Sequence, residues 1–561
     1  MTKPPERLHP VRPRRRPWLS ARRGPRLAPR LTPWLAWPLA AAAVLAAAIP
    51  APAAAPGGGP PRVESPRPVV AVAQGALRGR DHDGAQEFLG LPYAAAPVGE
   101  ARLRAPREAR RWSGVREATT QAPACVQFSP FGLADPSAVS EDCLHLDVYR
   151  PRTARAGARL PVVLWIHGGA YSQGTGTQFG GRTMAELTDS IVVAVNYRLG
   201  QLGYLGLPEL GRENPLASGS FGLMDQIAAL RWTRENIAAF GGDPGKVTVS
   251  GQSAGAGSVC ALLASPQAAG LFGRAILQSG PCTLLAPPDR ARAESEGRAF
   301  AASVGCAEPE RVAACLRAVP AADLVGAART RPTAGPAHGD GLLPVEPAAA
   351  IRSGAWNKVP VLIGSTRSEA RLFVAFTHPQ LTAEQYTARV RATYGAAADE
   401  VLARYPVTGY ASPYLALSAV LTDAGFACRT YGTARLFSAQ VPTYLYEFDD
   451  PDSPTLRGAQ VPGLDMSNAH SAELAYLHDF TMGDRPLTPV QTALAHRMKR
   501  YWGAFARSAD PNAPGQVRWP AAGPRTTALV LSPTDTRPSG SFAADHRCDF
   551  WQTLSAPAPL P

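Results

Sequence analysis

The chain has 561 residues, of which 45% are hydrophobic and 18% are charged. This balance allows a large core and excludes a chain that is disordered throughout. The formal net charge is +13, but ten basic residues and one acidic residue lie within residues 1–55. The remainder has the ordinary charge of a globular domain, so we expect no nucleic-acid partner.

The amino-terminal segment has the composition of an export signal. A basic stretch is followed by an apolar run over residues 39–49 and by small residues that include Ala53 and Ala55. We expect residues 1–55 to be a secretory signal peptide, residues 56–66 a flexible lead-in and residues 556–561 a tail. The apolar run is shorter than the ~20 residues that span a bilayer. We therefore expect a secreted protein without a membrane span in the mature chain; an uncleaved signal anchor is the alternative.

Short apolar runs alternate with helical patterns between residues 67 and 555. Each run indicates a buried strand that is followed by a turn, and the runs are 160–166, 191–195, 247–249, 275–278, 359–363 and 443–446. Residues 221–239 have the apolar spacing of a crossover helix. Alternating strands and helices predict one α/β domain over residues 67–555, with a mostly parallel central sheet flanked by helices.

A nucleophile motif follows one of these strands. Residues 251–255 have the sequence G-x-S-x-G with Ser253 at the centre, and residues 256–264 after it are of helical character. This strand–turn–helix context is that of a nucleophile elbow, where small neighbours let a strained serine lift its Oγ above the sheet. Ser253 is therefore the candidate nucleophile.

A glycine pair follows another strand. Gly168 and Gly169 come directly after His167 and the strand 160–166. Backbone N–H groups at such a turn can point into a pocket, and with the N–H of Ala254 they would form an oxyanion hole. The two motifs together predict acyl transfer through an activated serine.

At these residues the chain resembles the type-B carboxylesterase family, which includes cholinesterases, bacterial p-nitrobenzyl esterase-like enzymes and some fungal lipases. The resemblance covers about residues 67–552. It rests on the elbow and on the segments 91–94, 97–99, 140–147, 196–198 and 240–244. It implies an α/β-hydrolase fold in which loop and helical insertions form the wall of the pocket.

The resemblance also implies a Ser–Glu–His triad. Glu369, after the strand 359–363, matches the family's acid, and His470 matches its general base. His470 would take the proton of Ser253 and pass it to the leaving alcohol, while Glu369 would orient the imidazole. Weaker candidates for the base and the acid are His478, Asp340, Asp449 and Asp450. Glu473 and Ser279 are expected to be structural partners of the site.

The eight cysteines are typical of an exported enzyme. Family positions imply the disulfides Cys125–Cys143, Cys306–Cys315 and Cys428–Cys548. Cys260 and Cys282 remain, either as buried thiols or as a fourth bridge. The spacing of a C-x-x-C zinc site is absent from the sequence, so we expect no metal, and we expect no cofactor. The family also implies two structural ion pairs, Arg102–Glu141 and Arg198–Asp225.

Departures from the family pattern narrow the expected substrate. Gln252 stands where the family often has Glu, and Leu133 lies near the position of the cation-binding Trp of cholinesterases. Without a negative charge or an aromatic face, a quaternary ammonium group loses its attraction. Phe373 is expected to wall the acyl side of the pocket. The expected function is a secreted serine carboxylesterase for neutral, short-to-medium-chain esters.

Two other functions stay open at this point. A lipase for longer acyl glycerols would use the loop 128–133, with its two Phe and one Leu, as a lid. The other is a non-catalytic binding protein of the same fold, although such relatives lack the serine. The expected partner is a small-molecule ester, and the sequence leaves the oligomeric state open.

Overall fold

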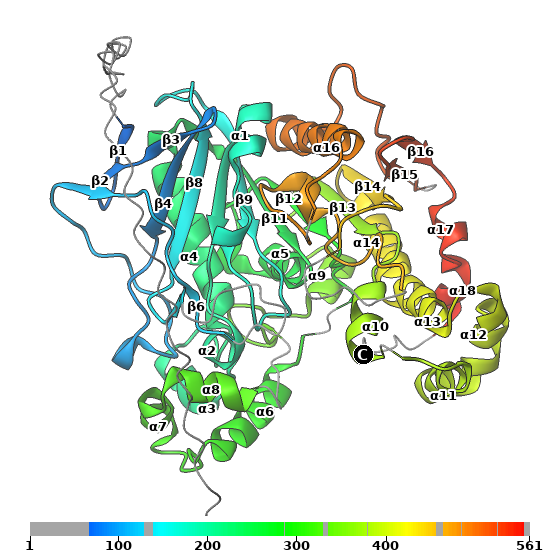
Figure 1. The fold of residues 1–561 in the computed structure, drawn as a ribbon. Coiled ribbons are helices and arrows are strands. Elements are labelled where there is room, and N and C mark those ends of the chain that lie inside the picture. The colour runs from blue at the N-terminus through cyan, green and yellow to red at the C-terminus, as the bar shows by residue number, and fades with distance from the viewer. Residues whose placement is uncertain are drawn as a thin grey trace, which may run out of the picture. The chain divides into compact units, whose positions relative to one another are not determined.

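An 11-stranded sheet forms the centre of the computed structural model (Figure 1). The structure describes residues 67–127, 138–284, 287–328, 335–378, 380–455, 464–483, 485–523 and 526–554, which belong to the unit Ser65–Pro561. In spatial order the strands are β16 (Arg537–Ser539), β15 (Ala528–Leu531), β14 (Thr443–Phe448), β13 (Val361–Thr366), β12 (Arg274–Gln278), β11 (Gly242–Gln252), β9 (Leu160–Ile166), β10 (Ile191–Val195), β8 (His145–Pro151), β4 (Ala85–Pro92) and β3 (Arg80–His82).

The central strands of this sheet are parallel. Neighbouring strands from β15 across to β10 all pair in parallel, whereas β16 at one edge and β8, β4 and β3 at the other pair antiparallel. The mostly parallel sheet predicted from the sequence is therefore confirmed. All six predicted strands are present. They could be predicted because strands that are buried on both faces consist of continuous apolar runs. The edge strand β3 and its neighbour β4 contain charged residues such as Arg80 and Glu87 and lack that signal.

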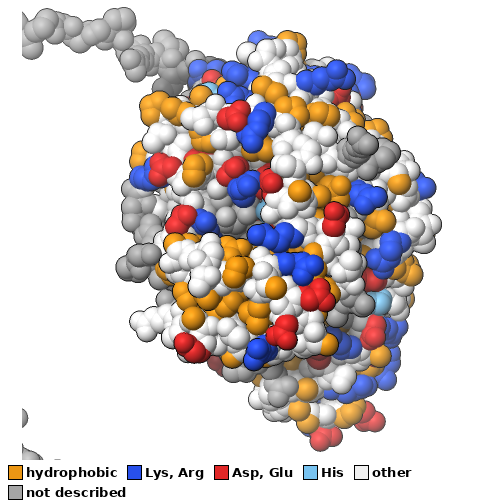
Figure 2. All heavy atoms as spheres, turned by 90° about the vertical axis from the view of Figure 1, so that its right-hand side faces the viewer, with side chains coloured by type: hydrophobic (Ala, Val, Ile, Leu, Met, Phe, Trp, Pro, Cys, Tyr) orange, Lys and Arg blue, Asp and Glu red, His pale blue; other side chains and the backbone are white. Residues whose placement is uncertain are grey.

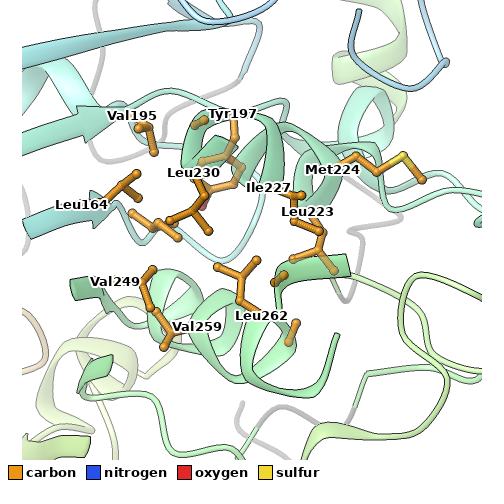
Figure 3. Close-up of a cluster of buried hydrophobic side chains, with 14 of the residues drawn as sticks. Leu164, Val195, Tyr197, Leu223, Met224, Ile227, Leu230, Val249, Val259 and Leu262 are labelled. Atoms are coloured by element: carbon orange, nitrogen blue, oxygen red, sulfur yellow. The ribbon is translucent and has the colours of Figure 1, made fainter. Parts of the chain in front are cut away.

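Helices cover both faces of the sheet. On one face lie α1 (Arg182–Thr188) and α16 (Pro489–Ser508); on the other lie α4 (Phe221–Asn236), α5 (Ala254–Ala264) and α14 (Cys428–Ser438). Because side chains alternate along a strand, Leu164 of β9 joins the core under α4 and α5, and Trp165 joins the core under α16. Figure 3 shows the first of these layers, with strand side chains meeting Leu230 of α4 and Val259 of α5.

The remaining elements are short. The sheet β1 (Val69–Val72), β2 (Gly75–Arg78), β5 (Val115–Glu117) and the pair β6 (Ala124–Cys125), β7 (Val139–Ser140) lie outside the main sheet. The other helices are α2 (Gly200–Tyr204), α3 (Pro208–Glu213), α6 (Arg290–Ser303), α7 (Val312–Ala318), α8 (Ala321–Ala328), α9 (Pro347–Ser353), α10 (Arg371–Thr377), α11 (Ala383–Tyr394), α12 (Ala398–Arg404), α13 (Pro413–Leu421), α15 (Leu474–Leu477), α17 (Phe542–Asp545) and α18 (Cys548–Thr553). A π-helix, Thr422–Ala427, joins α13 to α14. Within the described ranges, we find no helix long and apolar enough to cross a bilayer.

The crossover helix is shorter than the range predicted from the apolar pattern, residues 221–239. It spans α4 to Asn236 and then tightens into a 3-10 turn, Ile237–Phe240, that ends at Gly241 with φ +93°. Glycine commonly ends a helix in this way, because it adopts a positive φ without a steric penalty from a Cβ. The helix after Ser253, in contrast, begins two residues earlier than the predicted run, at Ala254.

Four disulfides and two ion pairs connect these elements. The three bridges that family positions imply are present, and Cys260 and Cys282 form a fourth, which joins α5 to the loop after β12. The expected ion pairs also form: Arg102 Nη2 lies 2.6 Å from Glu141 Oε1, and Arg198 Nη2 lies 2.7 Å from Asp225 Oδ1. Both arginines bind their carboxylate through two nitrogens, the strongest geometry for this pair.

Candidate active site

Ser253 lies at the sharp turn between β11 and α5. Its φ is +57° and its ψ is −124°, a strained conformation for a residue other than glycine. The Ser253 N–H donates to Gln278 O of the adjacent strand at 2.8 Å, which holds the turn against the sheet. A Cβ at Gly255 would lie 2.1 Å from Ile166 O, so only glycine lets α5 approach β9 this closely. The elbow predicted from the sequence has the required backbone.

Glu369 and His470 meet at the carboxyl ends of β13 and β14. His470 Nδ1 lies 2.5 Å from Glu369 Oε2, and both side chains are buried. The other carboxylate oxygen, Oε1, accepts from Thr366 N–H at 2.8 Å. The carboxylate has a partner on each oxygen, which offsets the cost of burying its charge. His470 N–H also donates to Glu369 O at 3.1 Å, so backbone and side chain are fixed together.

The loop that carries His470 is held by short polar contacts. Asn468, with φ +54°, accepts from Asp450 N–H through Oδ1 at 2.6 Å, and its own N–H donates to Ser453 Oγ at 2.7 Å. The imidazole itself lies among aromatic rings, with centroid distances of 5.0 Å to Phe373 and 5.4 Å to Phe426. These contacts limit the orientations that the imidazole can adopt.

The glycine pair turns directly in front of the elbow. A Cβ on Gly168 would lie 3.0 Å from Ser253 Cβ, and Gly169 has φ +111°. The N–H groups of Gly168 and Gly169 donate to no other described residue. Ala254 is the first residue of α5, so its N–H has no partner within the helix. Three donors beside one serine form a site for a developing oxyanion.

His167 fixes this turn from behind. Its ring stacks on Tyr197 at 4.4 Å, and its Nδ1 donates to Gly168 O at 2.8 Å. Burial lowers the pKa of His167 to about 4, so the ring is neutral at physiological pH. His167 therefore supports the glycine turn as a neutral ring.

Ser253 and His470 line one pocket of about 120 Å³. Its other described walls are largely apolar, and His470 is the ionisable side chain among them. The wall side chains are Phe179, Leu372, Phe373, Leu474, Phe480 and Met482, with Gln173, Gln178, Gln252 and Ser471 as polar members. Gln252 is buried and donates from Nε2 to Ser471 Oγ at 3.0 Å. The expected pocket residue Leu133 lies outside the described residues.

A second carboxyl group lies behind the pair. Glu473 is completely buried; its Oε1 accepts from Gln278 Nε2 at 3.4 Å, and its Oε2 has no partner among the described residues. Burial first, and then the charge of Glu369, raise the pKa of Glu473 to about 7. Glu473 is absent from the pocket wall, and the carboxylate that contacts His470 Nδ1 is that of Glu369.

The weaker candidates have other partners. His478 is buried 4.1 Å from the Trp165 ring, and burial lowers its pKa to about 3. Asp450 accepts from Gln491 at 2.8 Å, and Asp340 accepts from the N–H groups of Leu342 and Leu343. Asp449 accepts from Asn468 at 3.0 Å, and Ser279 N–H donates to Gly364 O at 2.8 Å. Each of these contacts is structural.

The structure also adds residues that the sequence did not reveal. Phe179, Phe480 and Met482 wall the pocket, and Phe426 contacts the His470 imidazole. They come from a turn, an irregular loop and a π-helix, where no repeating apolar pattern distinguishes a pocket wall from a core. Of the aromatic and apolar residues in the pocket wall, the sequence indicated only Phe373, because it lies close after Glu369.

Comparisons with known proteins agree with this geometry. The model of the carboxylesterase family matches residues 66–551. A para-nitrobenzyl esterase of Bacillus subtilis (strain 168) is 34% identical over 475 residues, which cover 81% of this chain and 92% of that protein. A cocaine esterase of Homo sapiens is 31% identical over 503 residues, which cover 84% of this chain and 87% of that protein.

Solved structures show the same likeness. A PNB esterase has a TM-score of 0.72 at 31% identity, covering 87% of this chain and 99% of that chain. A thermophilic PNB esterase has a TM-score of 0.69 at 31% identity, covering 83% of this chain and 96% of that chain. The α/β-hydrolase fold expected from the sequence is thus confirmed. The chain belongs to the carboxylesterase family, and it is a carboxylic ester hydrolase of the serine type.

Proposed function

We propose that this protein is an exported carboxylesterase that hydrolyses neutral, short-to-medium-chain esters through an acyl-enzyme on Ser253. The observation that carries the proposal is the 2.5 Å contact between His470 Nδ1 and Glu369 Oε2 beside a pocket that also contains Ser253. An orienting acid, a base and a strained serine in the order Ser, Glu, His are the elements of a hydrolytic triad.

Acylation begins with attack of Ser253 Oγ on the ester carbonyl carbon. His470 Nε2 takes the serine proton, and Glu369 stabilises the imidazolium that forms. The negative charge on the carbonyl oxygen develops in front of the N–H groups of Gly168, Gly169 and Ala254. Each such donor can stabilise the transition state by ~3 kcal/mol. Collapse of the intermediate breaks the ester C–O bond, and His470 gives its proton to the leaving alcohol.

Deacylation repeats these steps with water. His470 Nε2 takes a proton from water as the water oxygen attacks the acyl carbon, and the same three N–H groups face the oxyanion. Collapse then breaks the bond to Ser253 Oγ, which recovers its proton from His470. The products are the carboxylic acid and the free enzyme, and no cofactor enters the balance.

The pocket supports the choice of substrate. Its apolar walls favour uncharged acyl and alcohol groups, and a volume of about 120 Å³ suits short to medium chains better than long ones. Gln252 contributes no negative charge at the position where the carboxylate of many relatives would attract a cation. Neutral esters are therefore the proposed substrates, and choline esters are expected to be poor ones.

Export is supported by the cysteines. Four disulfides are typical of proteins that fold in an oxidising compartment. We expect the full chain to release a mature protein cleaved near residue 53 or 55. Amino-terminal sequencing of the protein from cells and medium tests this: an intact first 55 residues on a membrane-bound product would indicate a signal anchor.

The activity test uses p-nitrophenyl acetate, butyrate, octanoate and palmitate with wild type and Ser253→Ala. We expect maximal kcat/KM at acetate to octanoate and a loss of at least about 10³-fold in the variant. Ser508→Ala, an exposed serine at the end of α16, is the matched control and should behave as wild type. A maximum at palmitate above its solubility limit would indicate a lipase. Equal inertness of wild type and Ser253→Ala on every ester would favour a non-catalytic binding protein.

A further inference from the structure

His546 lies between two buried carboxylates in the carboxyl-terminal segment. It follows α17, and only 4% of its surface is exposed. Its Nδ1 lies 2.6 Å from Asp423 Oδ1 and its Nε2 lies 2.7 Å from Glu447 Oε1. Because a carboxylate only accepts hydrogen bonds, both ring nitrogens must donate, which requires the imidazolium form. Burial alone lowers the pKa of His546, but the bonds and charges of Asp423 and Glu447 outweigh it and raise the pKa to about 10.

Asp423 belongs to the π-helix that borders the catalytic pair. The preceding residue, Thr422, accepts through Oγ1 from the N–H of Ala370, the residue after Glu369, at 3.0 Å. Phe426 in the same π-helix contacts the His470 ring and stacks on Phe373 at 5.6 Å. π-Helices recur at functional sites, where they place side chains that a regular helix would not. The π-helix therefore touches both the acid loop and the base.

Glu447 connects His546 to the acid loop by a second route. It lies in β14, and its Oε2 accepts from Arg367 Nη1 at 2.9 Å. Arg367 stands two residues before Glu369, and its N–H donates to Phe448 O at 3.0 Å. The contacts from His546 through Glu447 and Arg367 thus hold the start of the acid loop against β14.

Charged and titratable groups of both signs surround His546. Asp423 also accepts from Tyr405 OH at 2.7 Å and lies 3.4 Å from Arg547 Nη1. Arg367 lies 3.7 Å from Asp449 and 3.8 Å from Asp545. Figure 1 places α12, α17 and α18 on the right-hand side of the view. On the surface of that side, basic and acidic side chains are interspersed (Figure 2). His546 is the buried cation that binds both carboxylates directly.

A disulfide anchors this segment independently of charge. Cys428, directly after the π-helix, is bonded to Cys548, two residues after His546. Cys428 Sγ also lies 3.2 Å from His546 O. The bridge keeps the segment beside the π-helix when the side chain of residue 546 changes. A substitution at His546 therefore tests the polar contacts without releasing the segment.

We propose that His546 is a positioning residue for catalysis: it binds the π-helix through Asp423 and the acid loop through Glu447, and so holds Glu369 and His470 in their reactive orientation. The inference rests on the proposed roles of Glu369 and His470. His546, Asp423 and Glu447 are absent from the pocket wall, so they act on the rate of chemistry and not on the binding of ester. A displacement of about 1 Å in a reacting group can cost about 10²-fold in rate.

The test is steady-state hydrolysis of ethyl butyrate in a pH-stat by wild type and His546→Gln. Glutamine donates to only one of the two carboxylates, so we expect kcat at pH 8 to fall about 10- to 100-fold while KM changes less than about 2-fold. Wild type should also lose kcat reversibly as the pH passes about 10, where the imidazolium deprotonates, and His546→Gln should lack this step. A general structural role would not produce a step that disappears in the variant.

Two further variants keep the outcomes distinct. Arg367→Gln removes the acid-loop end of the contact chain and should lower kcat alone; it decides the question if His546→Gln does not fold. Arg317→Gln, which breaks the ion pair with Glu213 at a site remote from the pocket, is the control and should leave kcat unchanged. Folded His546→Gln or Arg367→Gln with wild-type kcat, or a wild type without the alkaline step, would overturn the inference. Activity in His470→Ala would instead overturn the proposed triad.

Discussion

Gln252 Nε2 lies 3.2 Å from His470 Nε2. The amide that precedes the nucleophile therefore donates to the nitrogen that takes the serine proton in the proposed mechanism. A carboxylate at this position could not donate to His470 Nε2 and would add a negative charge beside it. The identity of residue 252 thus bears on both the charge of the pocket and the pH range of activity.

Gln252→Glu should move the acid limb of kcat/KM to higher pH, because a carboxylate stabilises the protonated imidazole and removes the free base. The same charge should raise the ratio of acetylcholine hydrolysis to 3,3-dimethylbutyl acetate hydrolysis, since the two esters differ mainly in the positive charge. We expect about a 10-fold change in that ratio. Gln252→Met, which has neither charge nor donor, is the control for the cation effect. Wild type that already prefers acetylcholine would contradict the assignment of neutral substrates.

Glu473→Gln should stabilise the protein at neutral pH. The folded pKa of about 7 lies above the ordinary value of 4.5, so the unfolded chain releases a proton between these values that the native state retains. Stability therefore falls as the pH rises from about 4.5 to 7, by up to about 3 kcal/mol. The Tm of Glu473→Gln relative to wild type should be higher at pH 8 than at pH 4.5. Glu235→Gln, at an exposed position of α4, should show no such difference. An offset in Tm that is equal at both pH values would argue against a buried, protonated Glu473.

Removing the fourth disulfide should cost both stability and rate. Cys260 and Cys282 close a loop of 22 residues, which corresponds to about 3 kcal/mol. The loop includes Gly280, where a Cβ would lie 2.5 Å from Ser253 O, so the bridge is tied to the elbow itself. Cys260→Ala with Cys282→Ala should lower both Tm and kcat, whereas Cys306→Ala with Cys315→Ala should lower Tm alone. Thiol titration of the denatured wild-type protein should find no free thiol; two thiols would show that the bridge does not form.

Phe373→Ala should extend the range of acyl chains. The Phe373 ring lies against His470 and Phe426 and forms part of the wall of the 120 Å³ pocket. Its removal should raise the ratio of kcat/KM for p-nitrophenyl octanoate over acetate about 10-fold, because one wall then no longer limits the chain. Phe376→Ala, at a more exposed position of the same helix, is the matched control. A fall in kcat/KM by the same factor for both substrates would indicate that Phe373 does not line the acyl side of the pocket.

The sequence predicted the sheet and the candidate triad for two different physical reasons. Strands such as β9 and β10 are buried on both faces and need uninterrupted apolar residues, which are visible without any alignment. Ser253, in contrast, was found because an elbow tolerates only small neighbours at fixed positions. Glu369 and His470 have no local signal of that kind, and only resemblance to a family assigned them.

The contacts that surround the candidate triad could not be predicted in this way. The π-helix continues the apolar pattern of α13 without a marker at Thr422. His546 contacts Asp423 and Glu447, which lie 123 and 99 residues away in the sequence. No sequence pattern at one of these positions indicates the other two. The same holds for Cys260, whose spacing from Cys282 is compatible with two thiols or one bridge. These contacts arise only from the tertiary arrangement of separate elements.

The parallel order of β11, β13 and β14 has a consequence for how activity is acquired during folding. Residues 252 and 470 are 218 positions apart in the chain, yet they touch, because residue 252 ends β11 and residue 470 follows β14 of the same sheet. Among the described elements, no single helix or hairpin contains Ser253, Glu369 and His470 together. Such distant pairings form late, because the chain must close long loops before any contact repays their entropy. Recovery of esterase activity after dilution from denaturant should therefore lag behind the return of far-ultraviolet circular dichroism, and would report completed strand order.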